Sequence, residues 1–323
     1  MTANPLLALP SMGEDLARIE DALHAAVHTP DPNLNEMASH LIVAGGKRIR
    51  PVLAVATALT AFEAATDDVV KGGVSCELVH LGSLYHDDVL DEAQIRRQVP
   101  SVNARWGNVR AIVAGDFLLA RASVIAASLG AEVAGLLGAC IGRLCEGEIA
   151  ELEGTFRVDR TEPAYFDSID GKTASLFSTA CRIGGIAAGL DRSAIDLLTG
   201  YGTKLGLVFQ IVDDILDVTA TAEELGKPAG HDLVEGVYSL PVLRALGAGD
   251  AAAAELRDLL GGPIEGAELD KALGLVRTGG VRSAVATARE LATEAAALAA
   301  QVGSSPATKA MAEAGHFLVD TVS

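Results

Sequence analysis

Aromatic residues, cysteines and basic residues are all scarce in this chain. Only 4% of its 323 residues are aromatic although half are hydrophobic, so the small aliphatic residues must form the core, as in closely packed helices. Lysine and arginine number 25 against 43 acidic residues, which gives a net charge of -18. Nucleic-acid backbones are bound by clustered cations, so we expect no nucleic-acid partner. An acidic protein can still bind a diphosphate when metal ions and local cations neutralise it.

The few cysteines form no Cys-x-x-Cys pair and no spacing typical of metal ligands. They are Cys76, Cys140, Cys145 and Cys181, each in an apolar context with helical periodicity. Such thiols are typical of reduced cysteines packed in a core rather than of a disulfide framework. The sequence therefore predicts free thiols and a cytoplasmic location.

The sequence also shows no pattern typical of a targeting segment or of a membrane span. The chain begins Met-Thr-Ala-Asn-Pro, without a basic region ahead of an apolar stretch, so no signal peptide is predicted. The longest apolar stretch runs from Ala122 to Ile141, contains Glu132 and is rich in alanine and glycine. We interpret it as a buried core helix and expect no transmembrane segment.

Helical periodicity runs through almost the whole chain, and no alternating strand pattern, repeat or dividing linker interrupts it. These features predict one all-α domain over residues 1–323, a helical bundle. The expected helices span residues 13–28, 34–44, 51–65, 67–91, 115–129, 131–154, 163–170, 172–189 and 192–219.

Two acidic clusters stand inside apolar helical runs. In the first, Asp87 and Asp91 lie one helical turn apart on one face, about 6 Å along the axis, with Asp88 beside them. A solvated charged face is the alternative, but the neighbouring residues are leucine and valine, and buried carboxylates need partners or metals. Oxygen ligands without cysteine favour Mg²⁺. The same spacing recurs at Asp213, Asp214 and Asp217.

Cations gather where an anion could bind. The segment from Gly45 to Pro51 carries Lys47, Arg48 and Arg50, and arginine suits bidentate contacts with phosphate. A basic helix end is the alternative interpretation. His80 lies seven residues before Asp87, on the face of the expected cavity, so we assign it to ligand binding. The other candidate cations are Arg96, Arg97, Lys172 and Lys227.

Taken in order, these motifs resemble those of the trans-polyprenyl diphosphate synthases. The resemblance covers roughly residues 35–245 and includes both Asp-Asp-x-x-Asp clusters and the glycine-lysine-arginine segment. It also includes Arg96-Arg97, Gly171-Lys172-Thr173, Phe209-Gln210 and Gly226-Lys227-Pro228. The family implies a bundle around a central cavity, a homodimer and Mg²⁺ as cofactor. Helical periodicity is compatible with that fold but does not by itself predict it.

The resemblance also implies a role for each matching residue. Asp87, Asp91, Asp213 and Asp217 would coordinate Mg²⁺, with Asp88 and Asp214 as supporting acids. Arg96, Lys172 and Lys227 would contact the diphosphate of the allylic substrate. Lys47, Arg50, His80 and Arg97 would hold isopentenyl diphosphate, the five-carbon extender. Thr173 and Gln210 would lie near the reacting carbons.

Product length depends on the residues that line the tunnel beyond the metal site. Short-chain members of the family close it with bulky aromatics near Gly82 and Ser83, and both residues are small here. We therefore expect a deep tunnel and a long-chain product, with a geranylgeranyl product as the alternative. The chain departs from the family at Val237, where many relatives have lysine, and at Gln98, where glycine is common.

Other classes of protein explain fewer of these motifs. A terpene cyclase shares the first acidic cluster but normally lacks the second and the extender-binding segment. A non-catalytic subunit of a heteromeric synthase usually loses the aspartates, which are intact here. A purely structural helical protein explains the periodicity but not the two acidic clusters.

Overall fold

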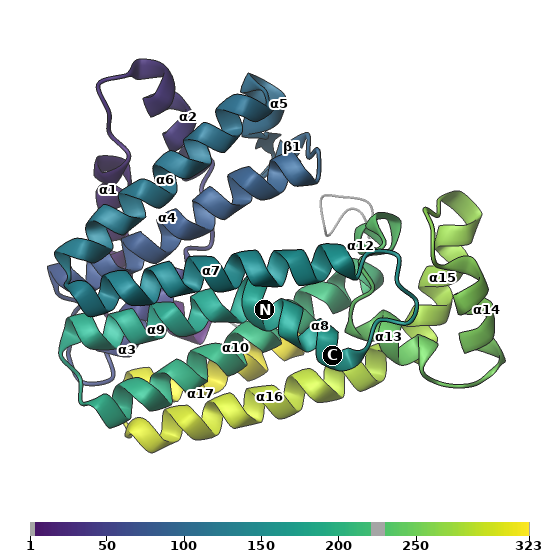
Figure 1. Ribbon diagram of the computed structural model, residues 1–323. Helices are drawn as coiled ribbons and strands as arrows, with labels where there is room; N and C mark the ends of the chain where they lie inside the picture. The colour runs from purple at the N-terminus through teal and green to yellow at the C-terminus, as the bar shows by residue number, and fades with distance from the viewer. Residues whose placement is uncertain (1–3, 221–229, 323) are drawn as a thin grey trace. The chain divides into compact units, whose positions relative to one another are not determined.

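The computed structural model describes residues 4–220 and 230–322, and almost all of them are helical, which confirms the all-α prediction (Figure 1). The chain divides into two compact units. Unit 1 comprises Met1–Ile141, Leu176–Gly202 and Gln301–Met311, and unit 2 comprises Gly142–Ser175, Thr203–Ala300 and Ala312–Ser323. A single domain around a central cavity stays a prediction.

Unit 1 holds the N-terminal half of the chain. Its elements are η1 (Pro5–Ala8), α1 (Met12–Ala26), α2 (Pro32–Val43), α3 (Ile49–Ala58), α4 (Asp67–Leu90), β1 (Ile95–Arg96), β2 (Val99–Pro100), α5 (Val102–Trp106) and α6 (Asn108–Ser128). The two short strands form an antiparallel hairpin in which Ile95 is paired with Pro100. Five further helices contribute segments to both units: α7 (Ala131–Glu153), α9 (Ser175–Ala188), α10 (Arg192–Thr219), α16 (Val281–Val302) and α17 (Pro306–Val319).

Helix α4 is the buried centre of unit 1 and carries the first aspartate cluster at its end. Thr66 caps its start by accepting a hydrogen bond from Val69 N. It packs along α6, and a Cβ atom on Gly82 would lie 3.1 Å from both Gly115 O and Leu119 Cδ2. Gly82 is therefore small because α6 packs closely against it. Its Cβ position faces α6 and not the tunnel that the sequence led us to expect.

Several expected boundaries were wrong for identifiable reasons. Helix α3 begins at Ile49, because proline at Pro51 still falls in the first turn, where its missing N–H costs nothing. It ends at Ala58, seven residues before the expected end. Helix α6 begins at Asn108, seven residues before the expected start, directly after Gly107 with its φ of 87°. Chain reversals fixed by tertiary contacts do not show in helical periodicity.

The long apolar stretch from Ala122 to Ile141 is not one helix. Gly130, with a φ of 114°, separates the end of α6 from the start of α7. Among the described residues, α6 is the one helix long and apolar enough to cross a membrane, and 33% of its apolar window is buried. The expectation of a buried core helix was therefore wrong for the residues of α6 that face outward.

Unit 2 is built on the C-terminal part of α10. Its own elements are α8 (Glu162–Ile169), η2 (Asp170–Ala174), α12 (His231–Glu235), α13 (Leu240–Leu246), α14 (Ala251–Leu259) and α15 (Gly266–Gly279). Helices α13, α14 and α15 pack together (Figure 1). The apolar core gathers residues such as Val208 and Ile215 of α10 with Leu240 of α13 and Ala284 of α16.

A π-helical segment, η2, follows α8 and presents Lys172 and Thr173. Such segments are rare and occur frequently at functional sites. Helix α7 crosses η2 at very short range, since a Cβ atom on Gly147 would overlap the backbone nitrogen of Lys172. A Cβ atom on Gly171 would likewise lie 2.8 Å from Arg143 O. Two glycines facing each other thus fix the position of the backbone that carries Lys172.

Replacing Gly147 with alanine tests this close approach. The added methyl group has no flexible neighbour to displace, so we expect the free energy of unfolding to fall by about 1–3 kcal/mol. Gly274→Ala is the matched control, because Gly274 lies inside α15 with nothing within 4 Å of its Cβ position. That control should gain about 0.5–1 kcal/mol. Equal effects of the two variants in chemical denaturation would contradict this account of η2.

Candidate active site

The end of α4 uses its middle aspartate to hold an arginine. Asp88 is fully buried, and its Oδ1 atom accepts a hydrogen bond from Arg96 Nε at 2.7 Å. Burial raises the pKa of Asp88, and the neighbouring Arg96 opposes that rise. Asp87 is half-buried, and Asp91 is exposed directly after the last helical residue. Asp88 therefore holds Arg96 beside the motif, and its role as a supporting acid stays a prediction.

A second buried carboxylate, Glu77, lies one turn before His80 on the same helix. Its Oε1 atom accepts a hydrogen bond from Arg48 Nη1 at 3.2 Å, and Arg97 Nη2 approaches it to 4.0 Å. Arg48 also pairs with Glu20 on α1, where Nε lies 2.5 Å from Oε1. Burial raises the pKa of Glu77, and the charges of Arg50, Arg48 and Arg97 oppose that rise.

The arginines around Glu77 differ in how they are held. Arg97 donates through Nη1 to the carbonyl oxygens of Leu41 and Gly45, so it supports the loop before α3 as well as facing Glu77. Arg50 lies 5.0 Å over the ring of Phe177. Its Nε atom is buried without a hydrogen-bond partner.

His80 lies among these same arginines. Its burial and the charges of Arg50, Arg97, Arg96 and Arg48 all lower the pKa of His80 well below its usual value. The imidazole is therefore neutral near pH 7. Of the four residues expected to hold the extender, the structure brings Arg50, His80 and Arg97 together near Glu77, while Lys47 is exposed in the loop before α3.

Glu77 was not among the residues selected from the sequence. The available signal was an acidic residue inside an apolar helix, three positions before a histidine already selected. Its partner Arg48 was noted only as one cation of a cluster. The structure shows that Arg48 is 5% exposed and held by two carboxylates, so it acts as a counter-ion rather than as an accessible anion ligand.

Replacing the two carboxylate partners of Arg48 one at a time compares the stability contribution of a buried carboxylate with that of an exposed one. Glu77→Gln removes a buried charge among three arginines, so we expect the free energy of unfolding to fall by about 1–3 kcal/mol. Glu20→Gln is the matched control, because Glu20 is 40% exposed and solvent screens its charge. Its loss should stay below about 1 kcal/mol. Equal midpoints of thermal unfolding for the two variants would contradict the assignment of Glu77 as the main counter-ion.

In unit 2, Lys172 is held by two acids of α7. Its Nζ atom lies 2.9 Å from Glu148 Oε2 and 2.5 Å from Glu151 Oε1. Each of the two glutamate side chains is 19% exposed, so solvent screens these ion pairs only partly. The two glutamates thus hold the ammonium group of Lys172 in place without a bound substrate.

The second aspartate cluster is linked to Thr173 and Gln210 by a chain of hydrogen bonds. Asp214 Oδ2 accepts from Tyr165 Oη at 2.5 Å, and Asp214 Oδ1 accepts from Gln210 Nε2 at 2.9 Å. Gln210 Oε1 in turn accepts from Thr173 Oγ1 at 2.7 Å. Burial raises the pKa of Asp214, while the hydrogen bonds from Tyr165 and Gln210 oppose that rise. Three predicted motifs therefore meet in one network.

The two outer aspartates of that cluster differ from each other. Asp213 is exposed, whereas Asp217 is only 3% exposed. Asp217 Oδ2 accepts a hydrogen bond from Asp232 N at 3.1 Å, which ties α10 to the short helix α12. Asp217 therefore has a structural contact in addition to its predicted role as a metal ligand.

The donor set suits Mg²⁺ in its chemistry but is not a complete cage. Among residues 4–220 and 230–322, no group of three or more acidic, histidine or cysteine side chains could hold a metal ion. Each motif offers two carboxylates one turn apart. Mg²⁺ is commonly bound by one or two carboxylates with substrate phosphates and water completing the shell, so the residues fit that mode. Lys227 lies outside the described residues.

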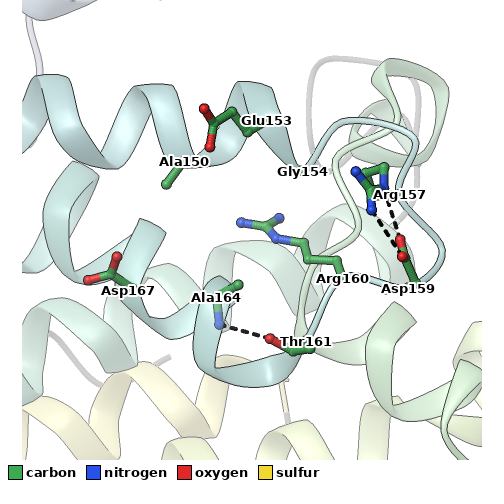
Figure 2. Close-up of a pocket in the computed structure, with 9 residues that line it drawn as sticks. All are labelled: Ala150, Glu153, Gly154, Arg157, Asp159, Arg160, Thr161, Ala164 and Asp167. Atoms are coloured by element: carbon green, nitrogen blue, oxygen red, sulfur yellow. Dashed lines mark hydrogen bonds and ion pairs between the residues drawn. The ribbon is translucent and has the colours of Figure 1, made fainter.

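Unit 2 also contains a cavity of about 330 Å³ that the motifs in the sequence did not indicate. It lies between the end of α7 and the start of α8, and Figure 2 shows the guanidinium of Arg160 pointing toward its middle. Arg157 is instead paired with Asp159, with Nε 2.9 Å from Oδ1. Arg160 Nη1 donates to Tyr238 O at 3.3 Å, and the group lies 5.7 Å over the ring of Tyr165.

Comparisons with known proteins agree with these motifs. A family model described as polyprenyl synthetase matches residues 31–276. A nonaprenyl diphosphate synthase of Mycobacterium tuberculosis is 40% identical over 264 residues, which cover 81% of this chain and 78% of the relative.

Two solved structures share the fold over nearly the whole chain. A decaprenyl diphosphate synthase from Rhodobacter capsulatus has a TM-score of 0.90 and 30% identity, and the match covers 98% of each chain. A polyprenyl synthase from Caulobacter crescentus, solved in complex with calcium and isoprenyl diphosphate, has a TM-score of 0.91 and 31% identity. That match covers 98% of this chain and 97% of the relative.

Proposed function

The chain belongs to the polyprenyl synthetase family, and we propose that it condenses isopentenyl diphosphate with an allylic diphosphate, head to tail and in trans, into a long-chain polyprenyl diphosphate. The observation that carries this proposal is that Thr173, Gln210 and Asp214, taken from three separate motifs, form one hydrogen-bonded network. The long-chain product is supported by the relatives, which include nonaprenyl and decaprenyl diphosphate synthases.

The residue roles follow from the charges at each position. Asp87 and Asp91, with Asp213 and Asp217, would hold Mg²⁺, which when bound stabilises the departing diphosphate. Arg96, which Asp88 holds, and Lys172, which two glutamates hold, are assigned to the diphosphate of the allylic substrate. Lys227 is assigned there from its motif. Lys47, Arg50, His80 and Arg97 are assigned to the diphosphate of the extender.

The chemistry that this chain must perform is mainly electrostatic. Breaking the allylic C–O bond leaves a carbocation and a diphosphate anion, and preorganised cations lower the free energy of that anion. Arg96 and Lys172 need little reorganisation, because each is already held by buried or half-buried carboxylates. The extender double bond then attacks, and a proton passes to the released diphosphate. The protein's remaining contribution is to position both substrates and exclude water.

Replacing Asp87 and Asp213 together with asparagine tests the metal assignment. The double variant should retain its helical content and lose turnover by at least about a hundredfold, since both motifs lose a charged ligand. Turnover is measured as incorporation of labelled isopentenyl diphosphate with Mg²⁺ and an allylic primer.

The matched control for that test is Asp68→Asn combined with Asp196→Asn. These exposed aspartates lie on the same two helices, α4 and α10, where Asp68 pairs with Lys71 and Asp196 with Arg182. The control should keep its turnover within about twofold, because exposed ion pairs contribute little. Retained activity in the Asp87 and Asp213 variant would refute the assignment.

We also propose that the outward face of α6 packs against a second copy of the chain. Val109, Val113 and Val124 lie on this face and are 77%, 54% and 61% exposed. Apolar side chains gathered on one exposed helix face are typical of an interface between subunits. The family resemblance implies a homodimer, and the free thiols agree with a cytoplasmic enzyme.

Val113→Asp combined with Val124→Asp tests this interface. Each aspartate would place a charge in a desolvated contact, so we expect the sedimentation mass to fall from that of a dimer toward that of a monomer. The unmodified protein should also fail to float with phosphatidylcholine vesicles. An unchanged mass in the variant, or flotation of the unmodified protein, would contradict the proposed occupant of this face.

A further inference from the structure

Tyr165 lies outside every sequence motif but contacts the second aspartate cluster directly. It is the fourth residue of α8, its side chain is 2% exposed, and its hydroxyl donates to Asp214 Oδ2 at 2.5 Å. The ring is held on two sides, edge-on by Phe166 at 5.4 Å and by the guanidinium of Arg160 at 5.7 Å. A buried ring with these neighbours presents its hydroxyl at a fixed point.

The hydrogen bonds beyond Tyr165 have a defined direction. In the structure Asp214 Oδ1 accepts a hydrogen bond from Gln210 Nε2 at 2.9 Å. That fixes which end of the Gln210 amide faces Asp214, and its oxygen therefore faces Thr173. The Thr173 hydroxyl then donates its single proton to Gln210 Oε1 at 2.7 Å. Its lone pairs are left to face away from Gln210.

We propose that Tyr165 is a positioning residue that, through Asp214 and Gln210, turns the Thr173 oxygen so that its lone pairs rather than its proton face the allylic carbons. A lone pair stabilises a developing carbocation, whereas a hydroxyl proton directed at it opposes it. The inference rests on the proposed function and adds to it, because it explains why a threonine hydroxyl in this position assists ionisation.

The orientation of the Thr173 hydroxyl depends on Tyr165, because the two oxygens of Asp214 each need a hydrogen-bond donor. Without the tyrosine hydroxyl, Asp214 Oδ2 is buried and unpaired, and a buried carboxylate rearranges toward any remaining donor. The donor that already bonds Asp214 is the Gln210 amide. Its rotation toward the second oxygen would release Oε1 from Thr173, and the threonine hydroxyl could then turn.

Tyr165→Phe removes this one hydroxyl. We expect kcat for condensation to fall about tenfold, while KM for isopentenyl diphosphate and the Mg²⁺ concentration for half-maximal rate each change less than about twofold. Tyr201→Phe is the matched control, since Tyr201 is also fully buried and its hydroxyl donates to Met311 O at 3.0 Å. The control should lower the thermal midpoint similarly and leave kcat within about twofold.

A double-mutant cycle with Thr173→Val tests whether Tyr165 acts through Thr173. If it does, the double variant should be about as slow as Thr173→Val alone. Independent losses that multiply would overturn the proposal. So would a kcat loss in Tyr201→Phe equal to that in Tyr165→Phe, or recovery of Tyr165→Phe at high Mg²⁺. A fully active Thr173→Val variant would overturn it as well. Failure of the proposed function itself would look different, since the unmodified protein would then incorporate no labelled isopentenyl diphosphate with any allylic primer.

Discussion

One constraint governs three polar contacts of this protein: a carboxylate buried inside an apolar helix must be given partners. Glu77, Asp88 and Asp214 are each at most 4% exposed, on helices that contribute many residues to the core. Glu77 and Asp88 each accept a hydrogen bond from an arginine. Asp214 accepts hydrogen bonds from a tyrosine and a glutamine. Since unpaired buried charges are strongly destabilising, these partners are fixed as firmly as the core itself. Fixed polar groups are what electrostatic catalysis requires.

The same constraint explains why motifs far apart in sequence act together. Asp88 on α4 holds Arg96 on β1, and Asp214 connects α8 to Gln210 and, through it, to Thr173 on η2. Close backbone packing sets the geometry in which this happens. The glycine contact between α7 and η2 brings Glu148 and Glu151 within reach of Lys172. The helices therefore act as rigid supports, and the polar groups need little adjustment during the reaction.

The sequence predicted the all-α class, most helices and the aspartate clusters, because the helical spacing of apolar residues and short motifs are both local properties of the chain. It did not predict the ends of α3 and α6, the two-stranded hairpin or the π-helical turn at Lys172. Those features are set by what packs against them, such as Gly147 against Gly171. Glu77, Tyr165 and Arg160 were missed for a related reason. Nothing in their neighbours along the chain shows which distant side chain they contact.

Gly82 illustrates the same limit. Its small size was interpreted as space for a growing product, yet in the structure that space is filled by Leu119 and the backbone of α6. A residue's size predicts that something comes close to it, and only the fold determines whether that is a ligand or a neighbouring helix. The long-chain assignment therefore depends on the relatives rather than on this residue.

The most direct test of the proposed reaction is the length distribution of the products. The purified protein would be incubated with Mg²⁺, farnesyl diphosphate and labelled isopentenyl diphosphate, and the products would be dephosphorylated and resolved by chain length. We expect a ladder that ends well beyond the geranylgeranyl product. A single geranylgeranyl product would keep the enzyme class and contradict the long-chain assignment, and no incorporation with any allylic primer would contradict the proposed reaction.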